Sequence, residues 1–145
     1  EQFRRNLIAR LKSYPEPSKI IFEILEDEGF KDIEVLKKFI KDIETYGAKI
    51  AIDDFGSGYS NLVELVKIKP DYIKVDGEII KDVHRNIQNC IVLETIVSLA
   101  KRLSVQLVAE FVENIEIQNK MEEMGIDYSQ GYYFSKPMPF IQRTM

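Results

Sequence analysis

The chain has 145 residues, of which 45% are hydrophobic, and its formal net charge at pH 7 is -4. This is enough apolar material for one domain with a core, while the negative charge and the lack of a basic cluster argue against long nucleic acid as a partner. The single cysteine, Cys90, precludes an intrachain disulfide and favours a reducing, cytoplasmic location, and no apolar run approaches the roughly 20 residues of a membrane span.

Helical and strand-like patterns alternate along the chain. In order, the spacing of apolar residues predicts a helix over 3–11, a strand over 19–25, a helix over 33–46, a strand over 48–54, a short helix over 59–66, a strand over 72–76, a long helix over 80–103, a strand over 105–110, a helix over 115–124 and a short strand over 128–132. Asp32 and Asn114 are well placed as helix N-caps, and Gly47 and Gly125 as C-terminal stops. The alternation favours one α/β domain with a parallel sheet.

The two faces of the predicted strands differ in polarity. The apolar face, expected to pack on helices, carries Ile20, Phe22, Ile24, Ile50, Ile52, Ile73, Val75, Val105, Leu107 and Ala109. The opposite face ends in polar residues, namely Glu23, Asp53, Lys74 with Asp76, Glu110 and Gln130. Polar groups at the same end of five successive strands are typical of a (β/α) barrel active site, so we expect a TIM-type barrel, incomplete, with about five βα units.

The long helix over 80–103 carries apolar residues that we expect on its buried side, namely Ile87, Ile91, Ile96 and Leu99. Cys90 lies among them and is expected to be a buried helix residue, not a nucleophile. His84 lies away from every strand end and is expected to be a surface or packing residue.

Asp53 and Asp54 are adjacent where the second strand gives way to a glycine-containing loop. Two neighbouring carboxylates repel one another when ionised, and a divalent metal would compensate for that repulsion. Two solvated acids that open a turn are the alternative for the pair taken alone. Glu23 and Glu110 add oxygen donors at other strand ends, with no histidine or thiolate beside them, and this set favours Mg²⁺ or Mn²⁺ over zinc.

Several carboxylates that share two cations about 3.5 to 4 Å apart suit in-line attack on a phosphodiester. Lys74 could add a positive charge there or orient the attacking water. An ion pair that holds acids inside the barrel explains Lys74 equally well from spacing alone.

Two other motifs do not hold. Asp54-Phe55-Gly56 matches the metal motif of protein kinases, but no His-Arg-Asp catalytic loop precedes it. The glycines of the next residues do not form a dinucleotide fingerprint, because Asn61 stands where the third glycine belongs. The loop of Phe55, Gly56, Ser57 and Gly58 is instead expected to move or to form contacts between subunits.

Five short motifs follow one another along the chain. They are Phe-Glu-Ile-Leu-Glu (22–26), Asp-Asp-Phe-Gly-Ser-Gly-Tyr-Ser (53–60), Lys-Val-Asp (74–76), Ala-Glu-Phe-Val-Glu (109–113) and Gln-Gly-Tyr-Tyr-Phe-Ser-Lys-Pro-Met-Pro (130–139). In order and spacing the sequence resembles the EAL domain family, the bacterial cyclic di-GMP phosphodiesterases. The resemblance implies metal-dependent hydrolysis of cyclic di-GMP to the linear dinucleotide in bacterial second-messenger signalling.

The resemblance also implies roles for individual residues. Glu23, Asp53 and Asp54 would be metal ligands, and Glu110 would bind metal, hold a metal-bound water or act as a base. Lys74 would help to position the attacking water, and Glu26 would tie the glycine loop to the metal site. Asp76, Glu113 and Gln130 would be supporting residues, the last two near the substrate or the water network. Phe111 stands where the family often has Gly, which bears on local substrate contacts.

Part of the family pattern is missing from the sequence. The Glu-Ala-Leu tripeptide does not occur, and a strand that supplies an Asn metal ligand would precede Glu1. A complete barrel has roughly 250 residues, so we expect residues 1–145 to be the C-terminal part of a single EAL-type barrel from a longer protein, which an absent segment could anchor to a membrane. We expect this piece alone to bind metal weakly and to hydrolyse little.

Unpaired sheet edges would invite pairing with another copy, as a homodimer. A sensor or GGDEF (diguanylate cyclase) domain is expected in the parent chain, as is common in the family. The alternative function is a catalytically inactive EAL-like receptor for cyclic di-GMP or a protein-interaction module. A barrel enzyme that uses Mg²⁺ on another phosphorylated substrate is a third hypothesis. The presence of every catalytic-type residue that this segment would carry favours the enzyme.

Overall fold

The structure is a computed structural model that describes residues 2–26, 30–58 and 62–139. Its elements are α1 (Gln2–Ser13), η1 (Pro17–Lys19), β1 (Ile21–Leu25), η2 (Phe30–Asp32), α3 (Ile33–Glu44), β2 (Lys49–Phe55), α4 (Leu62–Ile68), β3 (Tyr72–Val75), α5 (Gly77–Ile80), α6 (Ile87–Leu103), β4 (Gln106–Ala109), α7 (Ile115–Met124) and β5 (Tyr128–Ser129). The predicted α/β class is confirmed.

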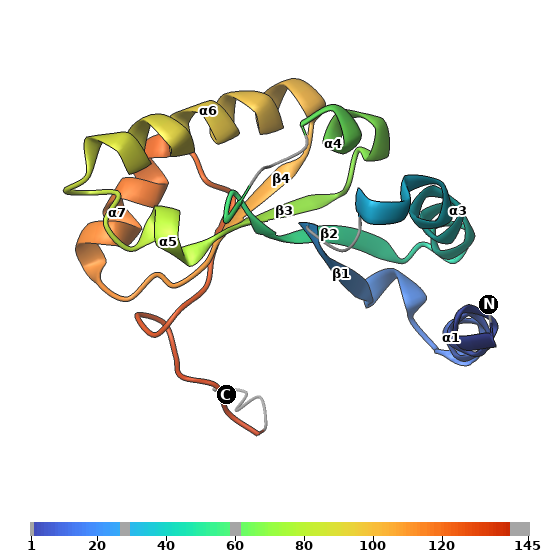
Figure 1. Ribbon diagram of the computed structural model, residues 1–145. Helices are drawn as coiled ribbons and strands as arrows, with labels where there is room; N and C mark the ends of the chain where they lie inside the picture. The colour runs from blue at the N-terminus through green and yellow to red at the C-terminus, as the bar shows by residue number, and fades with distance from the viewer. Residues whose placement is uncertain (1, 27–29, 59–61, 140–145) are drawn as a thin grey trace.

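All five strands form one parallel sheet in the order β1-β2-β3-β4-β5, which is also their order in the chain (Figure 1). Because the strands are parallel, their carboxyl ends meet at one edge of the sheet. Within the described residues, β1 and β5 each pair with one neighbour and not with each other. The sheet is therefore five units of an open barrel.

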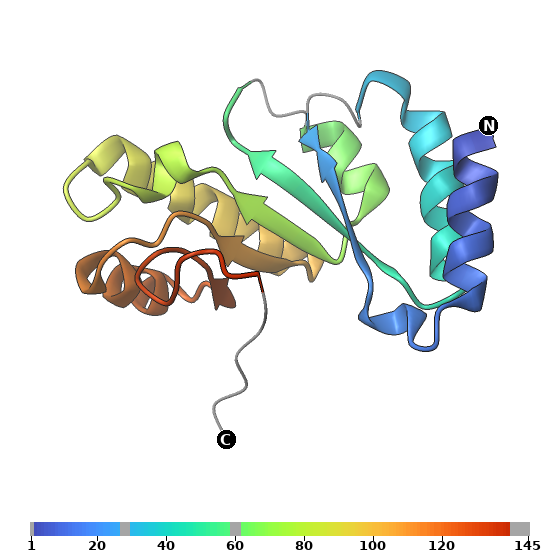
Figure 2. The same ribbon diagram turned by 90° about the horizontal axis from the view of Figure 1, so that it is seen from below.

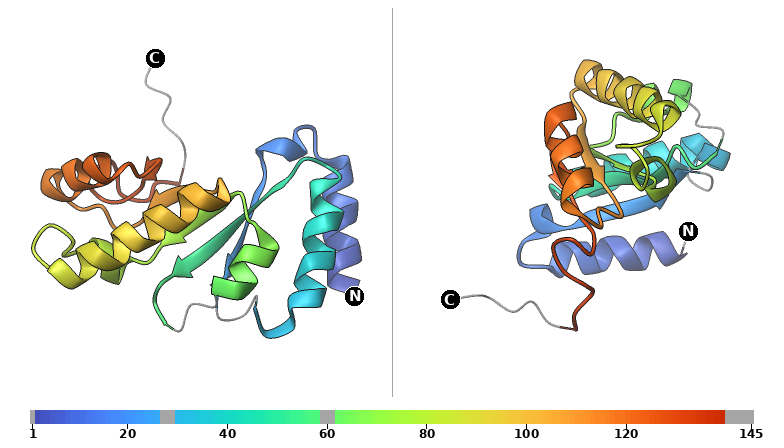
Figure 3. Two further views of the ribbon diagram at one scale, coloured as in Figure 1. Left: turned by 90° about the horizontal axis from the view of Figure 1, so that it is seen from above. Right: turned by 90° about the vertical axis from the view of Figure 1, so that its left-hand side faces the viewer.

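Helices cover one face of the central strands. Ile52 of β2 and Ile73 of β3 are completely buried, and they share a core with Ile43 of α3, Leu65 of α4 and Leu93 of α6. In Figure 1, α4 and α6 lie above β3 and β4. Figures 2 and 3 show α1 beside α3, next to β1 and β2. The predicted apolar face is confirmed in β2, β3 and β4, whereas that of β1 is only partly buried.

Strand β2 contains one extra residue relative to β3. Ile52 pairs with Ile73 and Phe55 pairs with Val75, so three steps along β2 match two along β3. Asp54 has a φ of 56°, a left-handed conformation that Asp tolerates better than most non-glycine residues. The bulge returns Phe55 to the core, where it is 1% exposed. Phe55 therefore ends β2 and does not belong to the predicted loop, because the extra residue shifts the alternation of faces.

The predicted long helix over 80–103 is wrong, since the structure has two helices, α5 and α6, with a turn between them. Asn86 separates them, because its side chain accepts hydrogen bonds from the backbone N–H groups of Gln88 and Asn89 and so caps α6. Ile87 and Ile91 are 71% and 55% exposed, so their predicted burial is also wrong. The predicted burial of Ile96 is confirmed, Leu99 is partly buried, and Leu93, Val97 and Ala100 complete the buried side of α6.

Three other predicted helix ends, at Asp32, Asn114 and Gly125, are confirmed, whereas α3 ends at Glu44, ahead of the predicted stop at Gly47. The side chains of Asp32 and Asn114 accept hydrogen bonds from the backbone of Val35 and Ile117, and Gly125 ends α7 in a left-handed conformation. The fifth strand is shorter than predicted, and residues 59–61 of the predicted short helix lie outside the described residues. Among the described residues, no helix combines the length and the apolar character that crossing a bilayer requires.

Candidate functional site

Lys74 of β3 lies at the centre of a group of acids from other strand ends. Its Nζ lies 2.7 Å from Asp53 Oδ1, 3.0 Å from Glu110 Oε1 and 3.1 Å from Glu23 Oε1. These residues come from β2, the end of β4 and β1, which are brought together only because the strands are parallel and in chain order. Four of the residues predicted to form the site therefore meet at the carboxyl edge of the sheet.

The Lys74 ammonium is positively charged in this environment. Its side chain is only 9% exposed, and burial by itself lowers the pKa of the amine. Hydrogen bonds to Asp53, Glu110 and Glu23 outweigh that effect and raise the pKa above the ordinary 10.5. The ion pairs therefore hold the acids together in the metal-free protein.

Asp53, Asp54 and Glu110 form a cluster in which one carboxylate oxygen from each lies within 4.8 Å of the others. Adjacent residues of a regular strand point to opposite faces. The bulge in β2 and the left-handed conformation of Asp54 remove that restriction, so both aspartates reach the cluster.

The electrostatics of this cluster fit a divalent cation. Burial raises the pKa of the Asp54 carboxyl, and the negative charges of Asp53 and Asp76 raise it further. Burial also raises the pKa of Glu110, although Lys74 opposes the shift. The protein alone thus compensates incompletely for the ionised acids. Three carboxylates without histidine or cysteine are hard oxygen donors of the kind that Mg²⁺ and Mn²⁺ prefer.

Gln130, which follows β5, fixes the orientation of Glu110. Its side-chain amide donates a hydrogen bond to Glu110 Oε1 at 3.0 Å, and its backbone N–H donates to the carbonyl of Ala109 at 2.9 Å. Glu110 Oε1 is therefore contacted both by the Lys74 ammonium and by the side-chain amide of Gln130.

The glycine loop after β2 is tied to two neighbouring strands. Glu26, which is 4% exposed, accepts a hydrogen bond from the backbone N–H of Gly56 at 3.3 Å. Asp76 caps α5 by accepting from the N–H of Glu78, and its own N–H donates to the Phe55 carbonyl at 3.1 Å. Ser57 and Gly58 are exposed. Glu26 thus contacts the loop itself at Gly56, whereas Asp76 contacts Phe55, the last residue of β2 before the loop.

Glu23 differs from the other acids. Its side chain is 53% exposed and contacts Lys74, and it does not belong to the cluster of Asp53, Asp54 and Glu110. Glu23 comes from β1 at the edge of the sheet, where no further strand pairs with it among the described residues. Its predicted role as a metal ligand stays a prediction.

A cavity of about 920 Å³ opens beside Glu110. Its walls come from the loops after β4 and β5, and they include Phe111, Glu113, Gln130, Tyr132, Phe134 and Met138. Sequence reasoning placed Glu113 and Gln130 near the substrate but did not assign the aromatic wall. The run of aromatic residues at 132–134, next to Gln130, is the sequence signal from which this wall could have been predicted.

Backbone contacts hold the two loops of this cavity together. The N–H of Val112 donates to the Gln130 carbonyl at 3.1 Å, and the N–H of Tyr133 donates to the Val112 carbonyl at 3.0 Å. Gly131 has a φ of 156°, and a Cβ built on it would overlap the Val112 backbone. A glycine is therefore required where the loops cross.

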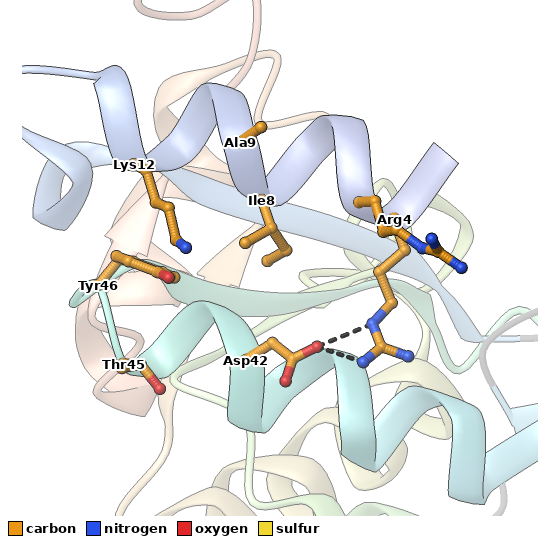
Figure 4. A pocket seen from close by; sticks show the side chains of 8 residues that line it. Arg4, Ile8, Ala9, Lys12, Asp42, Thr45 and Tyr46 are labelled. Atoms are coloured by element: carbon orange, nitrogen blue, oxygen red, sulfur yellow. Dashed lines mark hydrogen bonds and ion pairs between the residues drawn. The ribbon is translucent and has the colours of Figure 1, made fainter. Parts of the chain in front are cut away.

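A second hollow, of about 440 Å³, lies between α1 and α3 (Figure 4). Figure 4 shows Arg4 directed at Asp42, and the guanidinium Nε donates a hydrogen bond to Asp42 Oδ2 at 2.8 Å. This hollow holds one carboxylate, that of Asp42, which is already paired with Arg4, and none of the acids at the strand ends lines it. It has none of the chemistry of the first site.

Comparison with known proteins shows the family to which this sequence is similar. A sequence profile of the EAL domain matches residues 1–137. The chain is 38% identical over 123 residues to the probable cyclic di-GMP phosphodiesterase PdeA of Escherichia coli, covering 85% of this chain and 17% of that protein. It is 30% identical over 131 residues to the bifunctional diguanylate cyclase/cyclic di-GMP phosphodiesterase MucR of Pseudomonas aeruginosa, covering 90% and 19%.

Among solved structures, Klebsiella pneumoniae BlrP1 in a manganese/cy-diGMP complex at pH 9.0 superposes with a TM-score of 0.81 and 33% identity. The match covers 94% of this chain and 34% of that one. The chain thus spans about a fifth of the length of the two curated relatives.

Proposed function

The chain belongs to the EAL domain family, and on that premise we propose that it is part of a phosphodiesterase domain that opens cyclic di-GMP to the linear dinucleotide. The observation that supports this most directly is the cluster of Asp53, Asp54 and Glu110 beside Lys74. The relatives named as cyclic di-GMP phosphodiesterases and the metal-bound complex of BlrP1 agree with it.

We assign the metal ligands to Asp53, Asp54 and Glu110, with Glu23 joining them in the closed barrel. Mg²⁺ and Mn²⁺ are the proposed ions. When bound, divalent cations activate water and neutralise charge on the phosphoryl oxygens. Of these four acids, the first three already offer oxygens close enough to share an ion.

Lys74 and Glu110 carry the proposed chemistry of the chain itself. Lys74 donates hydrogen bonds toward the attacking water or a phosphoryl oxygen, where its charge opposes the developing negative charge. Glu110 lies beside Lys74 Nζ at 3.0 Å, and its role is to accept the proton of the attacking water. Gln130 holds Glu110 in position.

We further propose that these residues complete a barrel with N-terminal strands that carry the Glu-Ala-Leu motif. Five parallel strands with free edges support this, because a closed barrel of this type has eight. The chain alone would bind metal weakly, and its free edges would pair with a second copy. A cytoplasmic location and a GGDEF or sensor domain in the parent chain are part of the same proposal.

The test is hydrolysis of cyclic di-GMP with Mg²⁺ or Mn²⁺, with the linear product followed by chromatography. It compares this chain with a protein extended upstream by about 100 residues to complete the barrel. We expect turnover in the extended protein, its loss in Asp53→Ala, and little turnover in the short chain. Binding of cyclic di-GMP without cleavage by the extended protein would support a receptor and refute the enzyme.

A further inference from the structure

Phe111 follows Glu110 in a conformation that phenylalanine rarely adopts. Its φ is 54°, in the left-handed region, and its side chain is 52% exposed. A bulky residue there costs stability, and such strain concentrates at functional sites. Burial of the ring does not explain why this residue is held there.

One side of Phe111 is covered by α5. A Cβ built on Gly77 would lie 2.8 Å from Phe111 Cγ and closer still to Cδ2, so only glycine leaves room for the ring. The ammonium of Lys81 lies 5.3 Å from the ring centroid, at cation–π distance. Gly77 begins α5 and Lys81 is its C-cap, so both contacts come from this helix, and neither residue lines the cavity that Phe111 lines.

The cavity that Phe111 lines suits a nucleobase. Its other walls include the exposed rings of Tyr132 and Phe134. Lys136 lies over Tyr132, with its ammonium 5.8 Å from the ring centroid. Flat rings with cations beside them bind bases by stacking and draw in the attached phosphates. Glu110 lines this cavity and also belongs to the cluster of Asp53, Asp54 and Glu110. A base bound in the cavity would therefore lie next to a phosphate bound at that cluster.

We propose that Phe111 is a specificity-determining residue that stacks against one purine base of the substrate. The inference rests on the proposed function, because it names a contact that favours a phosphodiester carrying a base over one that carries none. Gly77 and Lys81 are positioning residues, since they fix the ring without lining the cavity. Loss of one stacked base weakens binding by roughly 10-fold or more.

The decisive variant is Phe111→Gly in the extended protein. Glycine adopts the left-handed conformation without strain, so the variant removes the ring and keeps the backbone conformation unstrained. We expect KM for cyclic di-GMP to rise roughly 10-fold or more with a smaller change in kcat. Phe111→Tyr, which keeps a stacking ring, should restore KM, whereas Phe111→Leu, which is apolar but not flat, should not. Ser104→Gly, at the left-handed C-cap of α6 (φ 58°) and outside the cavity lining, is the control for backbone freedom.

Product-like inhibitors identify the base as the group that is bound. We expect the Ki of GMP to rise in Phe111→Gly and the Ki of ribose 5-phosphate to stay the same, because only GMP carries a base. If wild type cleaves and Phe111→Gly keeps its KM and its GMP inhibition, the stacking inference is wrong while the proposed function stands. If wild type does not cleave, the proposed function fails, and the inference is then judged by whether Phe111→Gly weakens the Kd for cyclic di-GMP.

Discussion

Similar side chains are buried at the centre of the sheet and exposed at its β1 edge. Ile52 of β2 is 0% exposed, whereas Ile21 of the edge strand β1 is 46% exposed. The acids follow the same division: Asp53, on β2, is 19% exposed and belongs to the metal-type cluster, while Glu23, on β1, is 53% exposed and does not. Strand β2 has a neighbouring strand on each side, and these neighbours cover the side chains at its end. Strand β1 has one neighbour among the described residues, so its side chains stay more exposed. The completeness of the site therefore depends on closure of the barrel.

The largest expected effect is that of Lys74→Met at the centre. It leaves Asp53 and Glu110 without their shared cation, and removing one partner of a buried ion pair typically costs about 3–5 kcal/mol. We expect a loss of that order in urea unfolding of the metal-free chain. Hydrolysis by the extended protein should fall about 100-fold or more. Unchanged stability would show that the three ion pairs contribute nothing net.

The pH dependence of the same variant isolates the ammonium. Because the folded state raises the pKa of Lys74, its stabilising contribution is complete below the ordinary 10.5 and is lost as pH rises through the raised value. Wild type should therefore lose stability as pH rises above 10.5, and its difference from Lys74→Met should shrink over the same range. Urea midpoints across the alkaline range measure this.

A matched pair of isoleucines tests the comparison in the core. Ile52→Ala removes a fully buried side chain from β2 and should cost roughly 2–5 kcal/mol. Ile21→Ala on β1 should cost under about 1 kcal/mol in this chain, because much of the side chain already contacts water. In the extended protein the cost of Ile21→Ala should increase. Equal costs in the short and extended proteins would contradict closure at β1.

Asp54→Asn should stabilise the metal-free chain by up to about 1 kcal/mol at neutral pH. The fold raises the pKa of Asp54, so its ionised form disfavours folding, and that penalty appears as pH rises through the raised value. The gain should therefore vanish in acid. Asp53→Asn is the control with the opposite sign, because it removes a 2.7 Å contact to Lys74. Thermal unfolding with and without Mn²⁺ should show a smaller metal-induced shift in Asp54→Asn.

The smallest effect is expected for Glu23→Gln. Its exposed ion pair to Lys74 should contribute no more than about 0.5 kcal/mol to the stability of this chain, and Mn²⁺ affinity should hardly change. In the extended protein the same substitution should weaken Mn²⁺ binding, measured by calorimetry. A strong loss of Mn²⁺ affinity in the short chain would show that Glu23 reaches the metal without closure.

The sequence predicts the parts of this arrangement that depend on local pattern. Strand alternation placed Glu23, Asp53, Lys74 and Glu110 at one edge, and the structure brings all four together. It did not reveal the bulge at Asp54, because an extra residue changes the register with a neighbouring strand and leaves no mark in the strand itself.

The break at Asn86 was missed for a different reason. Isoleucines continue on both sides of it, so the apolar spacing is compatible with one uninterrupted helix, and only the capping hydrogen bonds of Asn86 distinguish the two. The partial exposure of β1 likewise depends on strands beyond its own sequence.

The identity of strand order and chain order has a consequence for synthesis on the ribosome. Each new strand pairs with the one made just before it, so the sheet can grow in the direction of translation without waiting for a distant segment. We expect arrest-peptide force measurements to show stepwise folding as successive βα units emerge. A single late step would show instead that the nascent chain stays unfolded until most of the sheet has been synthesised.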